Sequence, residues 1–130
     1  MGSGQAIVDL LSGSVDLNFE SPPNVLPHLK SEDYPAWSLS CALYLEAGIR
    51  GVEIGSVMFG KRLDDGTETY HRMELVRLAF PRRVYTQAHF DYILESMEEV
   101  VAKKDAIRGM RIVEEPPFLR HFTARFAPLA

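Results

Sequence analysis

The spacing of apolar residues switches repeatedly between the period of a helix and that of a strand, and this switching limits what the chain can fold into. In the stretch "PAWSLSCALYLEAG", Leu39, Leu43 and Ala47 recur at helical spacing. Pro35 suits the first turn of a helix, and Gly48 suits the position just past its end. We therefore predict a helix from Pro35 to Ala47.

Two β-rich stretches follow this helix and are connected through an Asp-Gly turn. The sequence "IRGVEIGSVMF" (49–59) predicts a strand, and "MELVRLAF" (73–80) predicts the strand that returns beside it. The turn "LDDGTE" (63–68) contains the Asp-Gly pair, which tolerates positive φ. We expect an antiparallel pair of strands that ends at Pro81, because proline cannot donate to a sheet.

A second helix is predicted from Thr86 onward. Thr86 suits the N-cap, and Lys103 and Lys104 suit the negative C-terminal end of the helix dipole. The apolar residues between these ends recur at the spacing of a single helical stripe. They are Phe90, Ile93, Met97 and Val100 or Val101. This stripe should face the core.

The two ends of the chain add further predicted strands. "VDLNF" (15–19) alternates and predicts a short strand, while "MRIVEE" (110–115) and "LRHFTARF" (119–126) predict two strands separated by a proline pair. In the last strand Phe122, Ala124 and Phe126 would share one face, and His121, Thr123 and Arg125 the other. The order β-α-β-β-α-β-β predicts an α+β layer sandwich with a mostly antiparallel sheet and helices on one face.

Composition excludes several classes of function. The 130 residues carry a net charge of -4, with 46% hydrophobic and 25% charged residues, which is ordinary for one soluble globular domain. Lys and Arg concentrate in the second half but alternate with almost as many acidic residues, so we expect no nucleic-acid partner. No apolar run approaches the ~20 residues of a membrane helix, and the start lacks the basic residues of a secretory signal. A cytoplasmic protein without a membrane partner is expected.

Side chains that could bind a metal or act as a nucleophile are sparse. Cys41 is the single cysteine, so no internal disulfide can form, which fits a reducing compartment. The four histidines have no i,i+4 pair and none neighbours the cysteine, so no metal site and no thiol dyad are predicted. They are His28, His71, His89 and His121. A metal-dependent hydrolase would require these histidines to converge in space.

The stretch "GSVMFGKR" (55–62) nearly matches a phosphate-binding loop. Arg62, however, stands where that loop needs a hydroxyl that binds Mg²⁺. Val57, Met58 and Phe59 are too bulky for a nest of backbone N–H groups. No nucleotide site is therefore predicted here.

Arg77 is the most unusual charge in the predicted strands. The face that carries Met73, Leu75 and Ala79 also includes Arg77, so its guanidinium is expected among apolar neighbours. An unpaired buried charge is costly, and the planar guanidinium suits a bidentate carboxylate. The partner would be internal, such as Glu53 on the neighbouring strand, or the carboxylate of a ligand. The pattern leaves both possibilities open.

Three separated stretches, in this order, together resemble one known family. They are "YLEAGIRGVEIGSVMFGK", "MELVRLAFPRRVYTQAHFDYI" and "EEPPFLRHFTARF". They resemble the C-terminal part of tryptophanase and tyrosine phenol-lyase, which are β-eliminating lyases that depend on pyridoxal phosphate (PLP). The resemblance runs from about Leu26 to Leu129. It implies that 26–130 is the small domain of a fold-type I PLP enzyme. Residues 1–25 depart from the family pattern and are predicted to be an atypical N-terminal segment with a short strand, which a cloning remnant at "MGSG" would partly explain.

The same resemblance implies roles for four residues. Arg77 resembles the arginine that binds the α-carboxylate of the substrate. His121 resembles a catalytic histidine that tryptophanases place near the substrate side chain, with Phe122 beside it. Tyrosine phenol-lyases tend to have Phe where His121 stands, and where Ile54 stands they have an Arg that contacts the phenol hydroxyl. Ile54 and His121 therefore both favour tryptophan over tyrosine as the substrate.

The resemblance also implies what this chain lacks. The family's cofactor lysine, its phosphate-binding loop and the residues that hold the cofactor ring lie in the large domain, so we expect no PLP on this chain alone and no activity. The expected partners are a large domain or companion chain, an amino-acid substrate, and further copies in a homo-oligomer. The full enzyme would cleave tryptophan to indole, pyruvate and ammonia. The alternative is a stand-alone binding or assembly module that kept the small-domain fold.

Overall fold

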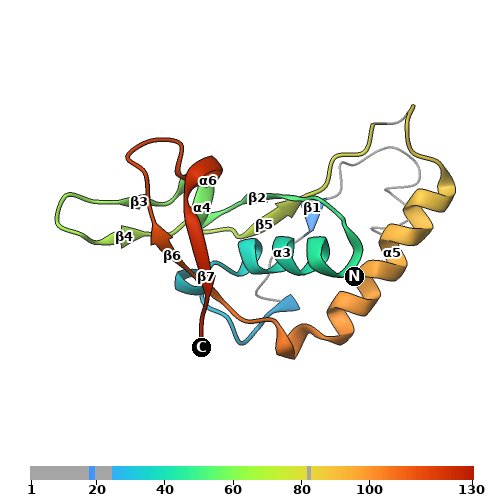
Figure 1. Ribbon diagram of the computed structural model, residues 1–130, viewed down its shortest axis with the longest axis horizontal. Coiled ribbons are helices and arrows are strands. Elements are labelled where there is room, and N and C mark those ends of the chain that lie inside the picture. Colours follow the sequence, from blue (N-terminus) through green and yellow to red (C-terminus); the bar gives the residue numbers. More distant parts are fainter. Residues whose placement is uncertain (1–17, 20–24, 82) are drawn as a thin grey trace.

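The computed structural model describes residues 18–19, 25–81 and 83–130 (Figure 1). Its strands are β1 (Asn18–Phe19), β2 (Val52–Ile54), β3 (Lys61–Arg62), β4 (Glu68–Thr69), β5 (Leu75–Arg77), β6 (Met110–Glu114) and β7 (Arg125–Pro128). Its helices are α3 (Pro35–Ala47), α4 (Ser56–Phe59), α5 (Gln87–Ala102) and α6 (Arg120–Thr123), with 3-10 turns η1 (Ser31–Asp33) and η2 (Lys104–Ala106). The predicted α+β class is confirmed.

The strands form three small antiparallel sheets instead of a continuous one. The first has the order β1-β5-β2, and the others are the pairs β3-β4 and β6-β7. The predicted pairing of the two central strands is confirmed, because β2 and β5 lie antiparallel with Ile54 opposite Leu75 and Val52 opposite Arg77. Figure 1 shows β3, β4 and α6 towards one end of the molecule and α5 towards the other.

Helix α3 has the predicted bounds and lies at the centre of the core. Leu39 and Leu43 are each 3% exposed, and the helix contacts β2, β5 and α5. Gly48 ends it in the left-handed conformation with φ 67, and its N–H donates to the Tyr44 carbonyl at 2.9 Å. The core residues are Leu26, Ala36, Leu39, Leu43, Val76, Leu78, Ile93, Met97 and Val100.

Helix α5 also begins as predicted. Thr86 is its N-cap, and the Thr86 N–H donates to Nδ1 of His89 at 3.1 Å. The predicted stripe is buried at Ile93 and Met97, and of the two alternatives for its end Val100 is buried while Val101 is exposed. None of the described helices is long and apolar enough to cross a membrane.

Two predicted strands are partly helical, and these predictions were wrong at four residues each. Residues 56–59 form α4 because carboxylates accept the N–H groups of its first turn. Residues 120–123 form α6, which follows Leu119 in the left-handed conformation at φ 55. The predicted alternation of faces in "LRHFTARF" is therefore wrong. The predicted N-terminal strand is seen at 18–19 as β1, and its residues 15–17 lie outside the described part.

Candidate functional site

Arg77 lies on the outer face of the central sheet. Val76 and Leu78 point into the core and are 0% and 4% exposed, whereas Arg77, Met73 and Ala79 are exposed. The expectation of a guanidinium buried among apolar neighbours is thus wrong. The reason is that the segment around β5 carries apolar residues on both faces, and the face that includes Val76 and Leu78 is the one that packs inward.

Ile54 shares the outer face with Arg77. Because Ile54 pairs with Leu75, it lies diagonally across from Arg77, two positions along the strand. Glu53 pairs with Val76 and points to the opposite, buried face, so it is not the partner of Arg77. Arg77 forms no ion pair with another residue of the described part. Its guanidinium is accessible at this surface.

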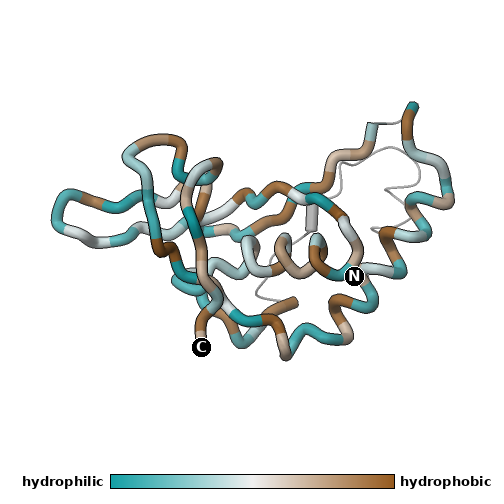
Figure 2. Tube along the Cα trace, viewed as in Figure 1, coloured by the Kyte–Doolittle hydropathy of each residue, from teal (hydrophilic) through white to brown (hydrophobic). Residues whose placement is uncertain are grey.

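His121 and Phe122 lie together on the turn α6. Their ring centroids are 3.8 Å apart, and the Phe122 side chain is 73% exposed. Phe118 and Leu119, just before the turn, are 81% and 68% exposed. The brown tube between β6 and α6 in Figure 2 marks this apolar loop, and Val113 near the end of β6 is 55% exposed as well. Among the four predicted site residues, His121 therefore lies beside Phe122 on α6, and Ile54 lies near Arg77 on the central sheet, as two separate pairs.

Arg120 connects these two pairs, and sequence analysis missed it. Its side chain is 9% exposed, its Nε donates to the Val57 carbonyl at 3.1 Å, and its Nη2 donates to the Ser56 carbonyl at 2.6 Å. Ser56 and Val57 belong to α4, which follows Ile54 after a single glycine. The guanidinium therefore fixes the turn that carries His121 onto the end of strand β2.

The charge of Arg120 is balanced by two acids from other segments. Its Nη1 lies 2.5 Å from Oε1 of Glu68 and 2.9 Å from Oε1 of Glu115. Arg62 meets the same two acids on the other side, with its Nε 3.6 Å and 3.1 Å from their Oε2 atoms. Burial acts to lower the pKa of Arg120, but hydrogen bonds to Glu115 and Glu68 raise it overall, so the guanidinium stays charged.

Two buried carboxylates lie beneath α4. Glu53 is 2% exposed and accepts the N–H groups of Val57 and Met58 at 3.1 and 3.0 Å. Glu74 is 3% exposed and accepts both the N–H of Ser56, at 3.0 Å, and its hydroxyl. Burial raises the pKa of Glu53 to about 7, and it also raises the pKa of Glu74. Alternation along β5 would have placed Glu74 inward if Val76 had been assigned to the core.

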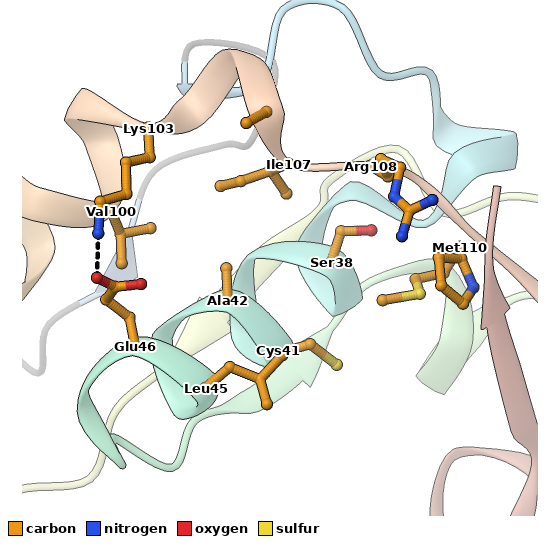
Figure 3. Close-up of a pocket in the computed structure, with 12 residues that line it drawn as sticks. Ser38, Cys41, Ala42, Leu45, Glu46, Val100, Lys103, Ile107, Arg108 and Met110 are labelled. Carbon is orange, nitrogen blue, oxygen red and sulfur yellow. Dashed lines mark hydrogen bonds and ion pairs between the residues drawn. The ribbon is translucent and has the colours of Figure 1, made fainter. Parts of the chain in front are cut away.

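A separate apolar hollow of about 310 Å³ lies between α3, the end of α5 and β6. Figure 3 shows Cys41 and Leu45 on the α3 side, and an ion pair between Lys103 and Glu46 at one edge. Burial raises the pKa of the Cys41 thiol, which disfavours the reactive thiolate. None of the four predicted site residues lines this hollow. Among the described residues, no three potential ligands are placed to hold a metal ion.

The fold and the site define a class: a small α+β domain with its own core, an accessible arginine on the outer sheet face, and a separate exposed apolar turn. No protein-family model matches the chain. It is 57% identical over 104 residues to a tryptophanase of Hyphomonas neptunium (strain ATCC 15444), which covers 80% of this chain and 23% of that protein. It is 58% identical over 107 residues to a tryptophanase of Salinibacter ruber (strain DSM 13855 / M31), which covers 82% and 22%.

A tyrosine phenol-lyase of Symbiobacterium sp. (strain SC-1) is 46% identical over 105 residues, which cover 81% of this chain and 23% of that protein. The chain thus spans less than a quarter of the length of the curated relatives it matches. Over about four fifths of its length it belongs to the tryptophanase and tyrosine phenol-lyase family, as a piece that corresponds to the C-terminal part and is closer to the tryptophanases. The resemblance predicted from the sequence is confirmed.

Proposed function

We propose that this chain is the C-terminal small domain of a PLP-dependent lyase that cleaves tryptophan to indole, pyruvate and ammonia, and that it is inactive alone. The observation that carries the proposal is its identity of 57% and 58% to two tryptophanases, against 46% to a tyrosine phenol-lyase, although a tryptophanase of Haemophilus influenzae is only 44% identical. Because those relatives are more than four times longer than the matched segment, most of such an enzyme lies outside this chain.

The described residues do not fit PLP by themselves. A cofactor lysine needs an enclosed position, yet Lys30, Lys61 and Lys103 are exposed, and Lys104 is only half-buried. A phosphate needs free N–H groups at a helix N-terminus. The N–H groups at the start of α4 are already bound by the chain's own carboxylates. We therefore assign the cofactor to the missing large domain or companion chain.

Arg77 is proposed to bind the α-carboxylate of the substrate. Its guanidinium is accessible on the outer sheet face and offers two parallel N–H donors to a carboxylate. Val52, directly opposite on β2, and Met73 are 37% and 50% exposed, so apolar side chains flank Arg77 on the β2 side. When a large domain covers the surface, water is excluded and the ion pair with a carboxylate becomes stronger. Ile54 beside it offers no hydrogen bond to a phenolic oxygen, which favours tryptophan.

His121 and Phe122 are proposed to contact the substrate side chain. An exposed phenylalanine beside an imidazole suits an indole ring, because the aromatic face packs on the ring and the imidazole can exchange a proton with its nitrogen. The exposed Phe118 and Leu119 extend this apolar surface. A surface of this kind is typical of an interface, and the missing large domain is its proposed cover.

A chimera tests the proposal directly. In the Hyphomonas neptunium tryptophanase, the segment aligned with this chain is replaced by the chain's own residues, and indole is measured after addition of PLP and L-tryptophan. We expect indole from the chimera and none from the isolated chain. Indole from the isolated chain would refute the claim that it lacks the catalytic core. A chimera that folds and binds PLP but releases no indole would refute the proposed domain role.

A stand-alone module is the second candidate, and one observation favours it. The chain buries a core of its own between α3, α5 and the central sheet, so it can fold without a partner. A small domain that has lost its cover should self-associate through the exposed Phe118, Leu119 and Phe122. Light scattering separates the two candidates, because a strictly monomeric chain at high concentration supports the autonomous module.

A further inference from the structure

Glu53 and Glu74 approach each other at Gly55. A Cβ placed on Gly55 would lie 2.5 Å from Oε2 of Glu74 and 2.6 Å from Oε1 of Glu53, so the two oxygens can be no more than about 5 Å apart. Among the described residues, Oε2 of Glu74 has no hydrogen-bond partner. Both side chains are at least 97% buried. Two negative charges in this buried position would repel each other strongly.

The other groups that face the pair only partly compensate two charges. On the Glu53 side these are the N–H groups of α4 and the guanidinium of Arg120, which lowers the pKa of Glu53 but is already shared between Glu68 and Glu115. On the Glu74 side they are Ser56, the backbone of Ala36 and the imidazole of His71. The backbone N–H of His71 also donates to the Ser56 hydroxyl at 2.9 Å. A single proton would relieve the repulsion and give Oε2 of Glu74 a partner.

We propose that Glu53 and Glu74 hold one proton between them in the folded chain, and that this proton positions α4 and, through Arg120, the turn that carries His121 and Phe122. With the proton bound, one carboxyl donates to the other and both keep their bonds to the first turn of α4. When the proton leaves, repulsion at Gly55 displaces α4. The Ser56 and Val57 carbonyls move with α4, and Arg120 is bound to both.

The pair therefore makes the arrangement of α6 depend on pH near neutrality. Burial raises the pKa of Glu53 to about 7, with Glu74 as a further cause, and the proton belongs to the pair because the two sites are coupled. The importance of this movement for catalysis rests on the proposed function, because only that function makes His121 a catalytic residue. The proton and the movement exist in the isolated chain and can be tested there.

Carboxyl ¹³C NMR of the full chain, labelled at the glutamate side chains, tests the proposal. Glu53→Gln and Glu74→Gln identify the two signals, and Glu95→Gln, on the exposed face of α5, is the matched control. We expect the pair to titrate in two coupled steps, with the upper midpoint near 7. The amide signals of Phe122 and Ala124 should move with the upper step.

Three results would overturn the proposal. If the wild-type carboxyls both titrate near 4.5, the pair holds no shared proton; this result needs no variant to fold. If the amides of α6 stay fixed through the upper step, the positioning role is wrong. If the amide signals of α6 shift with pH as much in Glu53→Gln, Glu74→Gln and His71→Gln as in the wild type, a group other than these three causes the movement. None of these results depends on indole release, so failure of the proposed function remains distinguishable.

Discussion

The substitution Glu53→Gln should lower the stability of the fold at acid pH and raise it at alkaline pH. The wild-type pair must lose a buried proton as the pH rises, whereas Glu53→Gln has no proton to lose at this position. The pKa of Glu53 is raised from 4.5 to about 7. A raised pKa means that the protonated carboxyl stabilises the fold at low pH, and this stability is lost as the pH rises through 7.

The magnitude follows from the size of the shift. A shift from 4.5 to about 7 corresponds to roughly 3 kcal/mol of unfolding free energy, of which about 2 to 3 kcal/mol disappears between pH 5 and pH 8. The Gln amide cannot accept both of the N–H groups that Glu53 accepts, from Val57 and Met58, and one lost hydrogen bond costs about 1 kcal/mol. Glu53→Gln should therefore be about 1 kcal/mol less stable than wild type at pH 5 and about 1 to 2 kcal/mol more stable at pH 8.

Urea unfolding at pH 5 and pH 8 measures this crossover. Tryptophan fluorescence reports the transition, because Trp37 stacks on Phe126 with ring centroids 4.4 Å apart. Histidine titration affects wild type and variant alike, so the difference between them isolates the carboxyl pair. If Glu53→Gln is less stable by the same amount at both pH values, the buried proton does not exist and the reasoning fails.

Two further predictions concern a buried ion-pair partner and a glycine at positive φ. Arg120→Ala should lower the unfolding free energy by about 3 kcal/mol, because it leaves the carboxylates of Glu68 and Glu115 with only the exposed Arg62 as a partner. The control Arg125→Ala removes only an exposed ion pair and should cost less than about 1 kcal/mol, so equal losses in urea unfolding would contradict this account. Gly48→Ala should cost about 1 to 2 kcal/mol in the same assay because φ is 67 there, and an unchanged midpoint would show that the left-handed end of α3 is not required.

The elements that sequence analysis placed correctly are those whose signals are local. Pro35 and Gly48 bound α3 from within its own sequence, and Thr86 caps α5 with a residue three positions away. The helical turn α4 depends instead on Glu74, which is 18 residues from Ser56. The turn α6 is fixed by Arg120, 63 residues from Val57. Contacts at such separations leave no periodic pattern in the sequence.

The surroundings of the site residues could not be predicted from the sequence either. Arg77 was singled out by strand alternation, whereas the roles of Ile54, Arg77, His121 and Phe122 came from the family resemblance, and the structure supplies their surroundings. The face of Arg77 was assigned wrongly because a three-residue strand with apolar residues on both sides does not specify which side is buried. Arg120 was missed because a single Arg in an amphipathic stretch looks like a solvated residue until its partners are known.

The most direct test of the central claim is the loss of kcat/KM for L-tryptophan when Arg77→Gln is made in the tryptophanase chimera. Arg72→Gln is the matched control, because Arg72 is also an exposed arginine of the same segment. If Arg77 binds the substrate carboxylate, removing it should cost about 2 to 5 kcal/mol, which is a loss of at least roughly 30-fold, and Arg72→Gln should stay within about twofold. Equal activity of the two variants would contradict the assignment of this surface to the substrate.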